Sequence, residues 1–348
     1  MTQAPLPISN ISLHDFSQKI FQPFLTQEGV TEIAVNRPGE VWCEQYGVWH
    51  KYDNADITNK LLNSFAVALA SFNETAIDDL RPVLSGTLET GERLQVVIYP
   101  ATEKDVISVT LRKPSDNIFS HESYIQQNFY EKVKIKEDSD SCRPELSHLY
   151  EKRKIAAFME KAVAQGKTIV FAGATGSGKT SFMKTLVEYI PLSCRLISIE
   201  DTSEMKFYQH QNYVHLFFTE DAGHSHEAIV TSAQLLKSCF RMKPDRILLS
   251  EIRGGEAWDF IKVINSGHGG SMTSIHAGSV KEALQGIVMR CFQNPECQNL
   301  SYDLIKNIVL SCVDIVCHIT CKAGKRYLND IYFKDIDVKK LKTHDQAF

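Results

Sequence analysis

Hydrophobic residues recur at helical spacing near the start of the chain. Leu13, Phe16 and Ile20 follow Ser12, and Asp15 stands three residues after that serine. A hydroxyl residue followed three positions later by an acidic one is typical of a helix N-terminus, and apolar residues three to four apart share one helix face. The pattern therefore predicts a capped amphipathic helix that begins at Ser12.

The next hundred residues mix short strand-like runs with one further helix. The helix is predicted over 56–72, where apolar residues again share one face. Strands are predicted over 32–36, 41–44, 83–88, 93–99 and 106–112, and the first two are joined by the turn residues 37–40. This mixture favours an α+β N-terminal domain, which we place at residues 1–130.

The pattern changes after this domain. Seven of the ten residues from Glu131 to Asp140 are charged, so we assign 131–144 to a charged, solvated linker. From residue 145 onward apolar runs alternate with helical stretches, and strands are predicted over 168–171, 195–199, 214–218, 247–249 and 272–275. The alternation predicts an α/β domain over 145–348, with a mostly parallel sheet and helices on both faces.

Composition narrows the class of protein. The 348 residues carry a formal net charge of −4, so nucleic-acid binding is not expected to dominate the surface. The longest apolar run, Ile308 to Thr320, is too short for a transmembrane segment and contains Asp314 and His318. Without a visible signal peptide, and with nine cysteines that form no CxxC pair, the chain is expected to be cytoplasmic.

One group of cysteines invites a metal-site interpretation. Cys312, Cys317, His318 and Cys321 lie within ten residues. Structural zinc sites favour ligand pairs two to four residues apart, and the apolar neighbours of these residues indicate a buried strand instead. We therefore expect these cysteines to be packing residues.

The strongest chemical signal is the segment GATGSGKT, which fits G-x-x-x-x-G-K-[ST]. It follows the predicted strand 168–171 and precedes a predicted helix over 181–190, as a phosphate-binding loop requires. Its backbone N–H groups would surround a β-phosphate, Lys179 would reach the β- and γ-phosphates, and Thr180 would offer a hydroxyl to Mg²⁺. The segment predicts ATP and Mg²⁺ as ligands, bound by Gly173, Ala174, Thr175, Gly176, Ser177, Gly178, Lys179, Thr180 and Ser181.

Acidic residues end two of the predicted strands. Glu200 and Asp201 follow the strand 195–199, with Glu204 just beyond, and the sequence leaves open which of the first two faces the nucleotide. Glu251 ends the strand 247–249 and is the residue we expect to orient the attacking water or to contact Mg²⁺ directly or through water. Glu251 is therefore the first candidate for a catalytic acid, and Glu200 the second.

Two histidines stand in the glycine-rich segment that follows. His268 lies in the turn and His276 at the end of the strand 272–275, and their spacing matches no helical metal pair. A histidine at a strand end beside the phosphate loop could sense the γ-phosphate or position a carboxylate. We select His276 for this role; for His268, hydrogen-bonded packing is the better expectation.

Four ordered segments, GATGSGKT, RLISIEDTSEM, RMKPDRILLSEIRGGEA and SGHGGSMTSIHAGS, together resemble the secretion ATPase superfamily, in particular the traffic ATPases of type IV secretion systems. The resemblance is dense from Glu145 to Asn294 and reaches the first domain through TEIAVNRPGEVW, GERLQ and SVTLRKPS. It implies a RecA-like ATPase domain, an Asp box at Glu200–Glu204, a Walker B glutamate at Glu251 and a His box at 268–276.

The resemblance also adds two arginines to the candidate site residues. Members of this family touch the nucleotide phosphates with arginines of the N-terminal domain, and Arg93 and Arg112 occupy the matching segments. One departure from many phosphate-loop NTPases is that Ser250, and not an aspartate, precedes Glu251, so the metal ligands are less well defined than the phosphate loop.

The resemblance implies that the chain is an ATP-hydrolysing homohexameric motor at the inner membrane. Through partner proteins it would attach to inner-membrane components of a type IV secretion or conjugation apparatus, and to a coupling ATPase. Two alternatives stay open at this point: a pilus assembly or retraction ATPase of the same superfamily, and a nucleotide-gated docking subunit with little turnover. The sequence does not identify the cargo.

Overall fold

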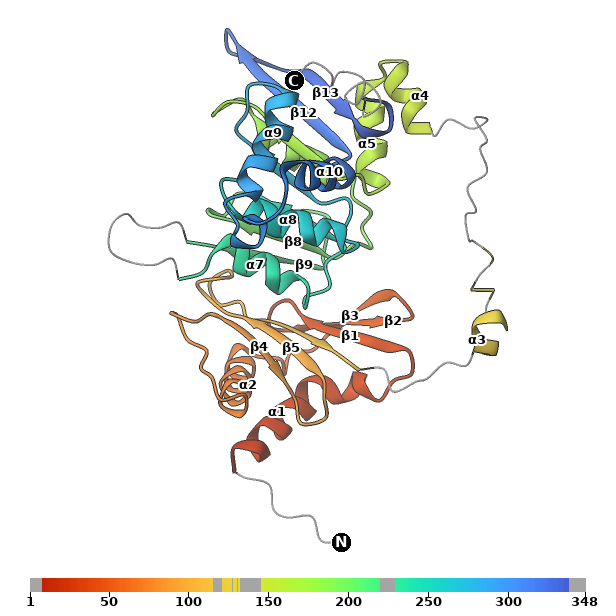
Figure 1. Ribbon diagram of the computed structural model, residues 1–348. Coiled ribbons are helices and arrows are strands. Elements are labelled where there is room, and N and C mark those ends of the chain that lie inside the picture. The colour runs from red at the N-terminus through yellow and green to blue at the C-terminus, as the bar shows by residue number, and fades with distance from the viewer. Residues whose placement is uncertain are drawn as a thin grey trace.

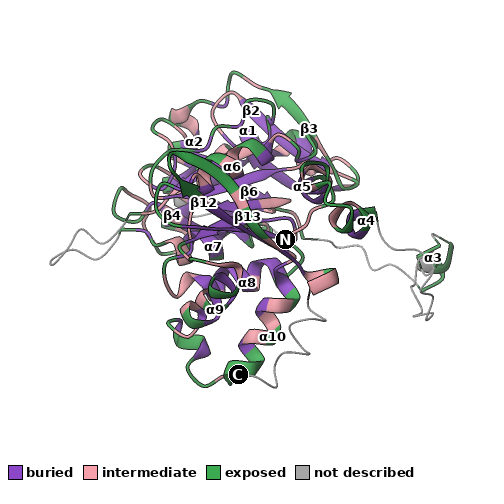
Figure 2. Cartoon of the chain, turned by 90° about the horizontal axis from the view of Figure 1, so that it is seen from above, coloured by how far each residue is buried: buried purple, intermediate pink, exposed green. Residues whose placement is uncertain are grey.

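The computed structural model describes residues 8–114, 121–126, 128–129, 131, 145–219 and 229–337. Two β-sheets with their covering helices lie one above the other (Figure 1). The predicted linker 131–144 lies outside the described residues, apart from Glu131. The short helix α3 (His121–Gln126) precedes it and stands apart from both sheets in Figures 1 and 2.

The first sheet is antiparallel and has the strand order β3-β2-β1-β6-β5-β4. Helices α1 and α2 pack their apolar faces against it, around buried residues such as Phe21, Phe65 and Leu94. The elements are α1 (Ile8–Leu25), β1 (Val30–Val35), β2 (Glu40–Gln45), β3 (Val48–Asp53), α2 (Asn59–Phe72), β4 (Val83–Thr87), β5 (Arg93–Val97) and β6 (Ser108–Arg112).

The first helix begins four residues before the predicted start. Ser12 lies inside α1 and is exposed, so it does not cap the helix. Asp15 forms an ion pair with Lys19 one turn later, at 2.7 Å. The Ser-x-x-Asp pattern here belongs to the solvent face of a helix, where such i,i+4 pairs are common.

The second sheet is mostly parallel, as predicted, with the order β13-β12-β7-β11-β10-β8-β9. All neighbouring strands are parallel except the hairpin of β12 and β13. Its strands are β7 (Ile169–Ala172), β8 (Leu196–Glu200), β9 (Tyr213–Phe217), β10 (Arg246–Leu249), β11 (Met272–Ile275), β12 (Ile315–Lys322) and β13 (Lys325–Phe333).

Helices cover both faces of this sheet because alternate strand residues point to opposite sides. In β7, Ile169 and Phe171 pack with α5 and α6, whereas Val170 and Ala172 join the core beneath α7 to α10. The helices are α4 (Glu145–Glu151), α5 (Ile155–Ala164), α6 (Lys179–Val187), α7 (Ser232–Cys239), α8 (Glu256–Asn265), α9 (Val280–Cys291) and α10 (Tyr302–Cys312), with a 3₁₀ turn at Pro295–Cys297.

Two strands of the structure had no counterpart in the sequence prediction. Strand β3 lies at the edge of the first sheet and exposes most of its side chains, as Figure 2 shows. Strand β13 lies at the edge of the second sheet and is exposed over its first half. Edge strands of this kind lack the buried apolar run on which the prediction depended.

A buried arginine joins the two sheets. Arg195, just before β8, has no exposed surface, and its guanidinium donates to Asn36 Oδ1 at 2.5 Å and to Asn212 Oδ1 at 2.6 Å. The guanidinium also lies 5.4 Å from the centre of the Trp49 ring. Because Asn36 directly follows β1 and Trp49 lies on β3, the amino end of β8 is fixed to the first sheet.

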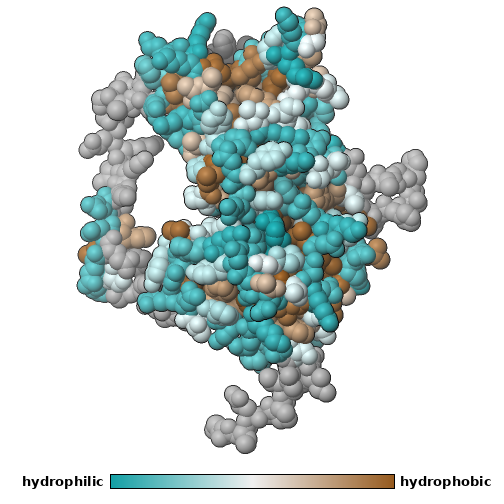
Figure 3. Space-filling model, turned by 180° about the vertical axis from the view of Figure 1, so that it is seen from behind, coloured by the Kyte–Doolittle hydropathy of each residue, from teal (hydrophilic) through white to brown (hydrophobic). Residues whose placement is uncertain are grey.

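A second connection lies along β9, the edge strand nearest the first sheet. The Phe217 N–H donates to the Ala101 carbonyl at 2.9 Å, and the Thr102 hydroxyl donates to the His215 carbonyl at 3.0 Å. Within the described residues, the helices give no sign of a membrane span. None of these described helices is both long and apolar enough to cross a membrane. Figure 3 shows hydrophilic residues over most of one face, with apolar ones in small groups.

Candidate functional site

The phosphate loop joins β7 to α6, as predicted, and its glycines are required by its shape. Gly173 and Gly178 have φ angles of 156° and 97°, in the region that favours glycine. A Cβ atom on Gly173 would lie 2.4 Å from the Ile319 carbonyl oxygen, so no side chain fits there. Gly178 is the residue before helix α6, whose first N–H groups therefore face the loop.

Lys179 is almost fully buried at the first position of that helix. Its Nζ atom donates to the carbonyls of Gly173 at 2.9 Å and Ala174 at 3.1 Å. Burial lowers the pKa of Lys179, and the nearby Glu251 carboxylate opposes this shift. The lysine side chain is therefore folded across the loop, where a bound phosphate would meet it.

A cavity of about 190 Å³ opens beside the loop, at the carboxyl ends of β8, β10 and β11. This is the edge of a parallel sheet at which ligands usually bind. Its lining joins the phosphate loop to the predicted acids and to His276; the lining residues are Thr175, Gly176, Lys179, Thr180, Glu200, Asp201, Thr202, Glu204, Met205, Ser250, Glu251, Arg253, Ser274 and His276. The structure thus brings Lys179, Thr180, Glu200, Glu251 and His276 together.

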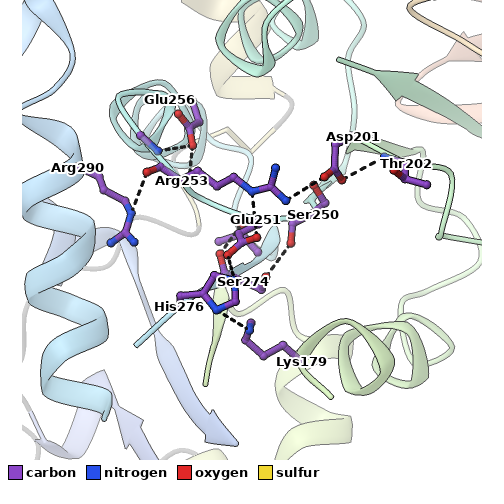
Figure 4. Close-up of polar contacts among 12 residues, drawn as sticks. Lys179, Asp201, Thr202, Ser250, Glu251, Arg253, Glu256, Ser274, His276 and Arg290 are labelled. Carbon is purple, nitrogen blue, oxygen red and sulfur yellow. Dashed lines mark hydrogen bonds and ion pairs between the residues drawn. The ribbon is translucent and has the colours of Figure 1, made fainter. Parts of the chain in front are cut away.

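Glu251 lines this cavity and lies in the middle of the polar contacts drawn in Figure 4. Its Oε1 atom lies 2.8 Å from His276 Nε2, but the geometry gives this buried oxygen no hydrogen bond within the described part of the chain. Burial raises the pKa of Glu251, while His276 and Lys179 act in the opposite direction. A buried carboxylate oxygen without a hydrogen bond is suited to accept one from water or to bind a cation.

Arg253 is a site residue that the sequence reasoning did not select. Its Nε atom lies 3.1 Å from Glu251 Oε2, and its Nη2 atom lies 2.9 Å from Asp201 Oδ2. The arginine therefore links the acids at the ends of β10 and β8, as Figure 4 shows. Its position two residues after Glu251, at the open end of the sheet, was the signal that could have identified it.

Glu200 lines the cavity, but both of its carboxylate oxygens already accept hydrogen bonds. Oε1 accepts from the Ser198 hydroxyl at 2.6 Å, and Oε2 accepts from the backbone N–H groups of Glu204 and Met205 at 2.8 and 2.7 Å. Burial alone would raise the pKa of Glu200, but these hydrogen bonds and His215 together lower it. Glu200 is ionised and anchors the loop after β8, and its predicted catalytic role stays a prediction.

His215 completes this buried network and was not predicted. Its Nδ1 atom lies 2.5 Å from the Ser198 hydroxyl, and its ring stacks on Phe207 with centres 4.8 Å apart. His215 faces Glu200 because alternate residues of neighbouring strands β8 and β9 share one face. The alternation of β9 was visible in the sequence, but its pairing with β8 was not.

His268 lies at the opposite end of β11 from His276. Its Nδ1 atom is 2.9 Å from the Pro244 carbonyl, and it does not line the cavity. The length of the strand between them separates the two histidines, since each residue of a strand advances the chain by about 3.3 Å. His268 has the packing role expected for it.

Arg93 and Arg112 lie on the first sheet, directly opposite each other on β5 and β6. Arg112 Nε lies 3.6 Å from Glu32 Oε1, and two thirds of its side chain is exposed. Neither arginine lines the cavity of the same chain. Their role as phosphate ligands therefore stays a prediction.

The cysteine group is divided between two elements: Cys312 ends α10, and Cys317 and Cys321 lie on β12. Cys312 and Cys317 are buried, as expected, but Cys321 is exposed near the end of the strand, so the packing role expected for it is wrong. Cys317 Sγ lies 3.8 Å from Met159 Sδ in the core, and His318 Nδ1 lies 3.4 Å from the Asn329 amide. Within the described residues, no three histidine, cysteine or acidic side chains are grouped as a metal site would require.

Comparison with known proteins identifies the family of this chain. The family described as type II/IV secretion system protein matches residues 128–330. The chain is 44% identical over 306 residues to the type IV secretion system protein VirB11 of Brucella suis, covering 88% of this chain and 85% of the relative. It is 36% identical over 326 residues to the type IV secretion system protein PtlH of Bordetella pertussis, covering 92% and 95%.

A solved structure shows the same fold. The crystal structure of the VirB11 ATPase from the Brucella suis type IV secretion system, in complex with sulphate, superposes with a TM-score of 0.86 at 42% identity. The match covers 92% of this chain and 97% of the other. The similarity therefore includes both sheets.

Proposed function

Because this chain belongs to the type II/IV secretion system protein family and is a close homologue of the VirB11 ATPases of type IV secretion systems, we propose that it hydrolyses ATP with Mg²⁺ to power such a system. The observation that carries the proposal is the cavity in which Lys179 of the phosphate loop meets Glu251 and His276. A buried cation, a buried acid and a glycine-rich loop are the parts that phosphoryl transfer needs.

The residues present fit a magnesium ion. Thr180 lines the cavity at the start of α6, and Glu251 offers the oxygen that lacks a hydrogen bond. Hydroxyl and carboxylate oxygens are the ligands that Mg²⁺ prefers, usually with several waters retained. Thr180 would hold the ion, and Glu251 would contact it directly or through water; the ion would neutralise the phosphate charge.

The other site residues have distinct roles in this proposal. Lys179 and the loop from Gly173 to Thr180 bind the β- and γ-phosphates, with Ser181 at the next position of the helix. Glu251 orients the attacking water, and His276 holds Glu251 in place. Glu200, whose oxygens are occupied, fixes the loop that carries Asp201, and Arg253 sets the position of Asp201 against Glu251.

We further propose a homohexameric ring, built from a domain over 1–130, a linker over 131–144 and an ATPase domain over 145–348. Arg93 and Arg112 are exposed and do not line the cavity, so we propose that they reach the phosphates across the cleft between the two domains when nucleotide closes the first domain against the second. The ring would sit at the cytoplasmic side of the inner membrane and bind membrane components of the apparatus, and a coupling ATPase, through protein contacts.

The relatives favour this proposal over the first alternative, a pilus assembly or retraction ATPase. Relatives 36–44% identical over most of the chain are type IV secretion system proteins, which supports secretion over pilus assembly or retraction. The second alternative, a docking subunit with little turnover, predicts tight ATP binding without hydrolysis. Steady-state phosphate release measured beside equilibrium ATP binding distinguishes it from a motor.

The decisive experiment compares three proteins. Wild type should hydrolyse ATP in the presence of Mg²⁺, and Lys179→Ala should abolish hydrolysis because it removes the buried cation. Lys184→Ala is the matched control, since Lys184 lies on the same helix but pairs with Glu204 at 3.2 Å, outside the phosphate loop. Full hydrolysis by a folded Lys179→Ala protein would contradict the site assignment.

A further inference from the structure

The β12–β13 hairpin lies directly against the phosphate loop. A Cβ atom on Gly173 would meet the carbonyl of Ile319 in β12, and a Cβ atom on Gly178 would lie 2.8 Å from Cδ of Arg326 in β13. Glycine at position 173 is thus required partly because the backbone of this hairpin occupies the adjoining space, and the Arg326 side chain lies beside Gly178. The hairpin is the side wall of the loop, yet none of its residues lines the cavity that holds Glu251.

Arg326 brings a positive charge to this wall. Its Nε atom donates to the Gly176 carbonyl at 3.4 Å, a long hydrogen bond made at the surface of the protein. A guanidinium has five N–H donors, and within the described residues this is the one polar contact of the Arg326 side chain. Most of its donors therefore remain available beside the loop.

The order of the strands tells which part of a nucleotide would face Arg326. β7, which leads into the loop, lies between β11 and β12. Asp201, Glu251 and His276 all follow strands on the β11 side, so the terminal phosphate belongs on that side. Since the β-phosphate lies at the centre of such a loop, the α-phosphate points to the opposite side, toward β12 and β13.

The size of the cavity supports this division. It has about 190 Å³, whereas sites that enclose a whole small molecule usually have 300–1,000 Å³. The cavity therefore suits the terminal phosphate and its metal ion, and the remainder of the nucleotide lies outside it. On the β12 side of the loop, Arg326 donates to the Gly176 carbonyl.

We propose that Arg326 binds the α-phosphate of the nucleotide, an inference that rests on the ATPase function proposed above. A planar guanidinium can donate two parallel hydrogen bonds to a phosphate, which makes arginine well suited to this contact. Lys179 and Arg326 would then hold the phosphate chain from two sides of the loop.

The test compares Arg326→Gln with wild type in equilibrium binding. Four Mg²⁺-bound ligands compete with a fluorescent ADP: non-hydrolysable analogues of ATP and GTP, tripolyphosphate and pyrophosphate. The dissociation constants of the first three should rise about tenfold in Arg326→Gln, because one charge-assisted contact is lost. Pyrophosphate, too short to reach from the terminal-phosphate side to Arg326, should bind equally to both proteins.

Three results would overturn the proposal. Equal weakening of all four ligands would mean that Arg326 shapes the loop through Gly176 and does not touch the nucleotide. A loss that differs between the two nucleotides and is absent for tripolyphosphate would indicate contact with the base. Unchanged affinity for every ligand would mean that Arg326 has no part in binding.

Two further variants make the test specific. Lys325→Gln removes the same charge one residue earlier in β13, where the side chain points to the other face of the strand, and it should bind all four ligands as wild type does. Lys179→Ala should weaken all four. If wild type itself binds no nucleotide, the proposed function fails; if wild type and Lys179→Ala behave as expected and Arg326→Gln matches wild type, this inference alone fails.

Discussion

The ammonium nitrogen of Lys179 lies 3.3 Å from Nδ1 of His276. A protonated lysine has donors and no acceptor, so Nδ1 of His276 is the acceptor in this contact, and Nε2 on the other side of the ring lies 2.8 Å from Oε1 of Glu251. The three side chains come from the phosphate loop and from the ends of β11 and β10. His276 thus stands between Lys179, which we propose to bind phosphate, and Glu251, which we propose to orient water.

His276→Ala should lower kcat by about 10- to 100-fold and change KM little, because Glu251 loses the side chain that positions it while the phosphate loop stays intact. His268→Ala is the matched control, since His268 lies at the other end of β11. Steady-state kinetics of both variants provide the measurement. A raised KM with unchanged kcat would show that His276 serves phosphate binding through Lys179 instead.

Glu251→Gln should retain nucleotide affinity and lower kcat by about 100-fold or more, because shape is conserved and the negative charge that orients water is lost. Binding is measured at equilibrium and turnover by phosphate release. If affinity fell and the turnover of bound nucleotide stayed the same, Glu251 would be a ligand of the metal–nucleotide complex alone.

The pH dependence of the wild-type rate should reflect the raised pKa of Glu251. Since the ionised form is the one proposed to orient water, kcat/KM, which reports the groups of the free protein, should fall as pH decreases, and the fall should begin above 4.5, the ordinary pKa of a glutamate. A pH–rate profile of kcat/KM, with the folded state followed by circular dichroism at each pH, checks this. An acidic limb at or below the ordinary value would contradict it.

Arg253→Gln should lower kcat by about tenfold, because Glu251 and Asp201 lose the guanidinium that fixes their relative positions. Arg241→Gln is the matched control, an exposed arginine just beyond α7. The readout is kcat against KM for the two variants. Equal kcat in Arg253→Gln and wild type would show that the bridge has no part in turnover.

Glu32 should make the protein less stable as pH rises. It is buried on β1, and burial raises its pKa from 4.5 to about 7, although Arg112 and Lys243 act in the opposite direction. Between these values the unfolded state has released the proton and the folded state retains it, so the stability present below pH 4.5 is lost as pH rises through 7. The full loss is on the order of 3 kcal/mol.

Glu32→Gln should therefore raise the free energy of unfolding by roughly 2–3 kcal/mol at pH 8 and change it little at pH 4. Urea unfolding at the two pH values, followed by tryptophan fluorescence, measures the difference. Glu28→Gln, the same substitution at an exposed position, is the control. Equal stability of Glu32→Gln and wild type at pH 8 would refute the argument.

The sequence predicted those elements whose apolar pattern is local. The parallel strands β7, β8, β10 and β11 have short apolar runs bounded by turns, and the phosphate loop has a fixed spacing, so both were identified. Strands β3 and β13 were missed because exposed edge strands lack such a run.

Side-chain contacts between residues that are distant in the sequence could not be predicted from the sequence alone. Nothing in RLISIE indicates that Ser198 and His215 occupy the oxygen of Glu200, or that Arg253 turns back to Asp201. The pattern placed the acids at the right edge of the sheet because the carboxyl ends of parallel strands meet there. Whether an acid already has hydrogen-bond or ion-pair partners depends on side chains that are distant in the sequence, such as Arg253 beside Asp201, or that lie on the neighbouring strand, such as His215 beside Glu200.

The buried contacts of Arg195 have a consequence for how this chain can change over generations. Asn36, Trp49 and Asn212 meet one guanidinium that water does not reach, and a buried charge that loses a partner destabilises a protein by several kcal/mol. Loss of either asparagine would leave the guanidinium with one accepting amide fewer, so we expect such a substitution to destabilise the chain unless another acceptor replaces it. The two sheets, although far apart in sequence, are therefore expected to accumulate changes at this point jointly.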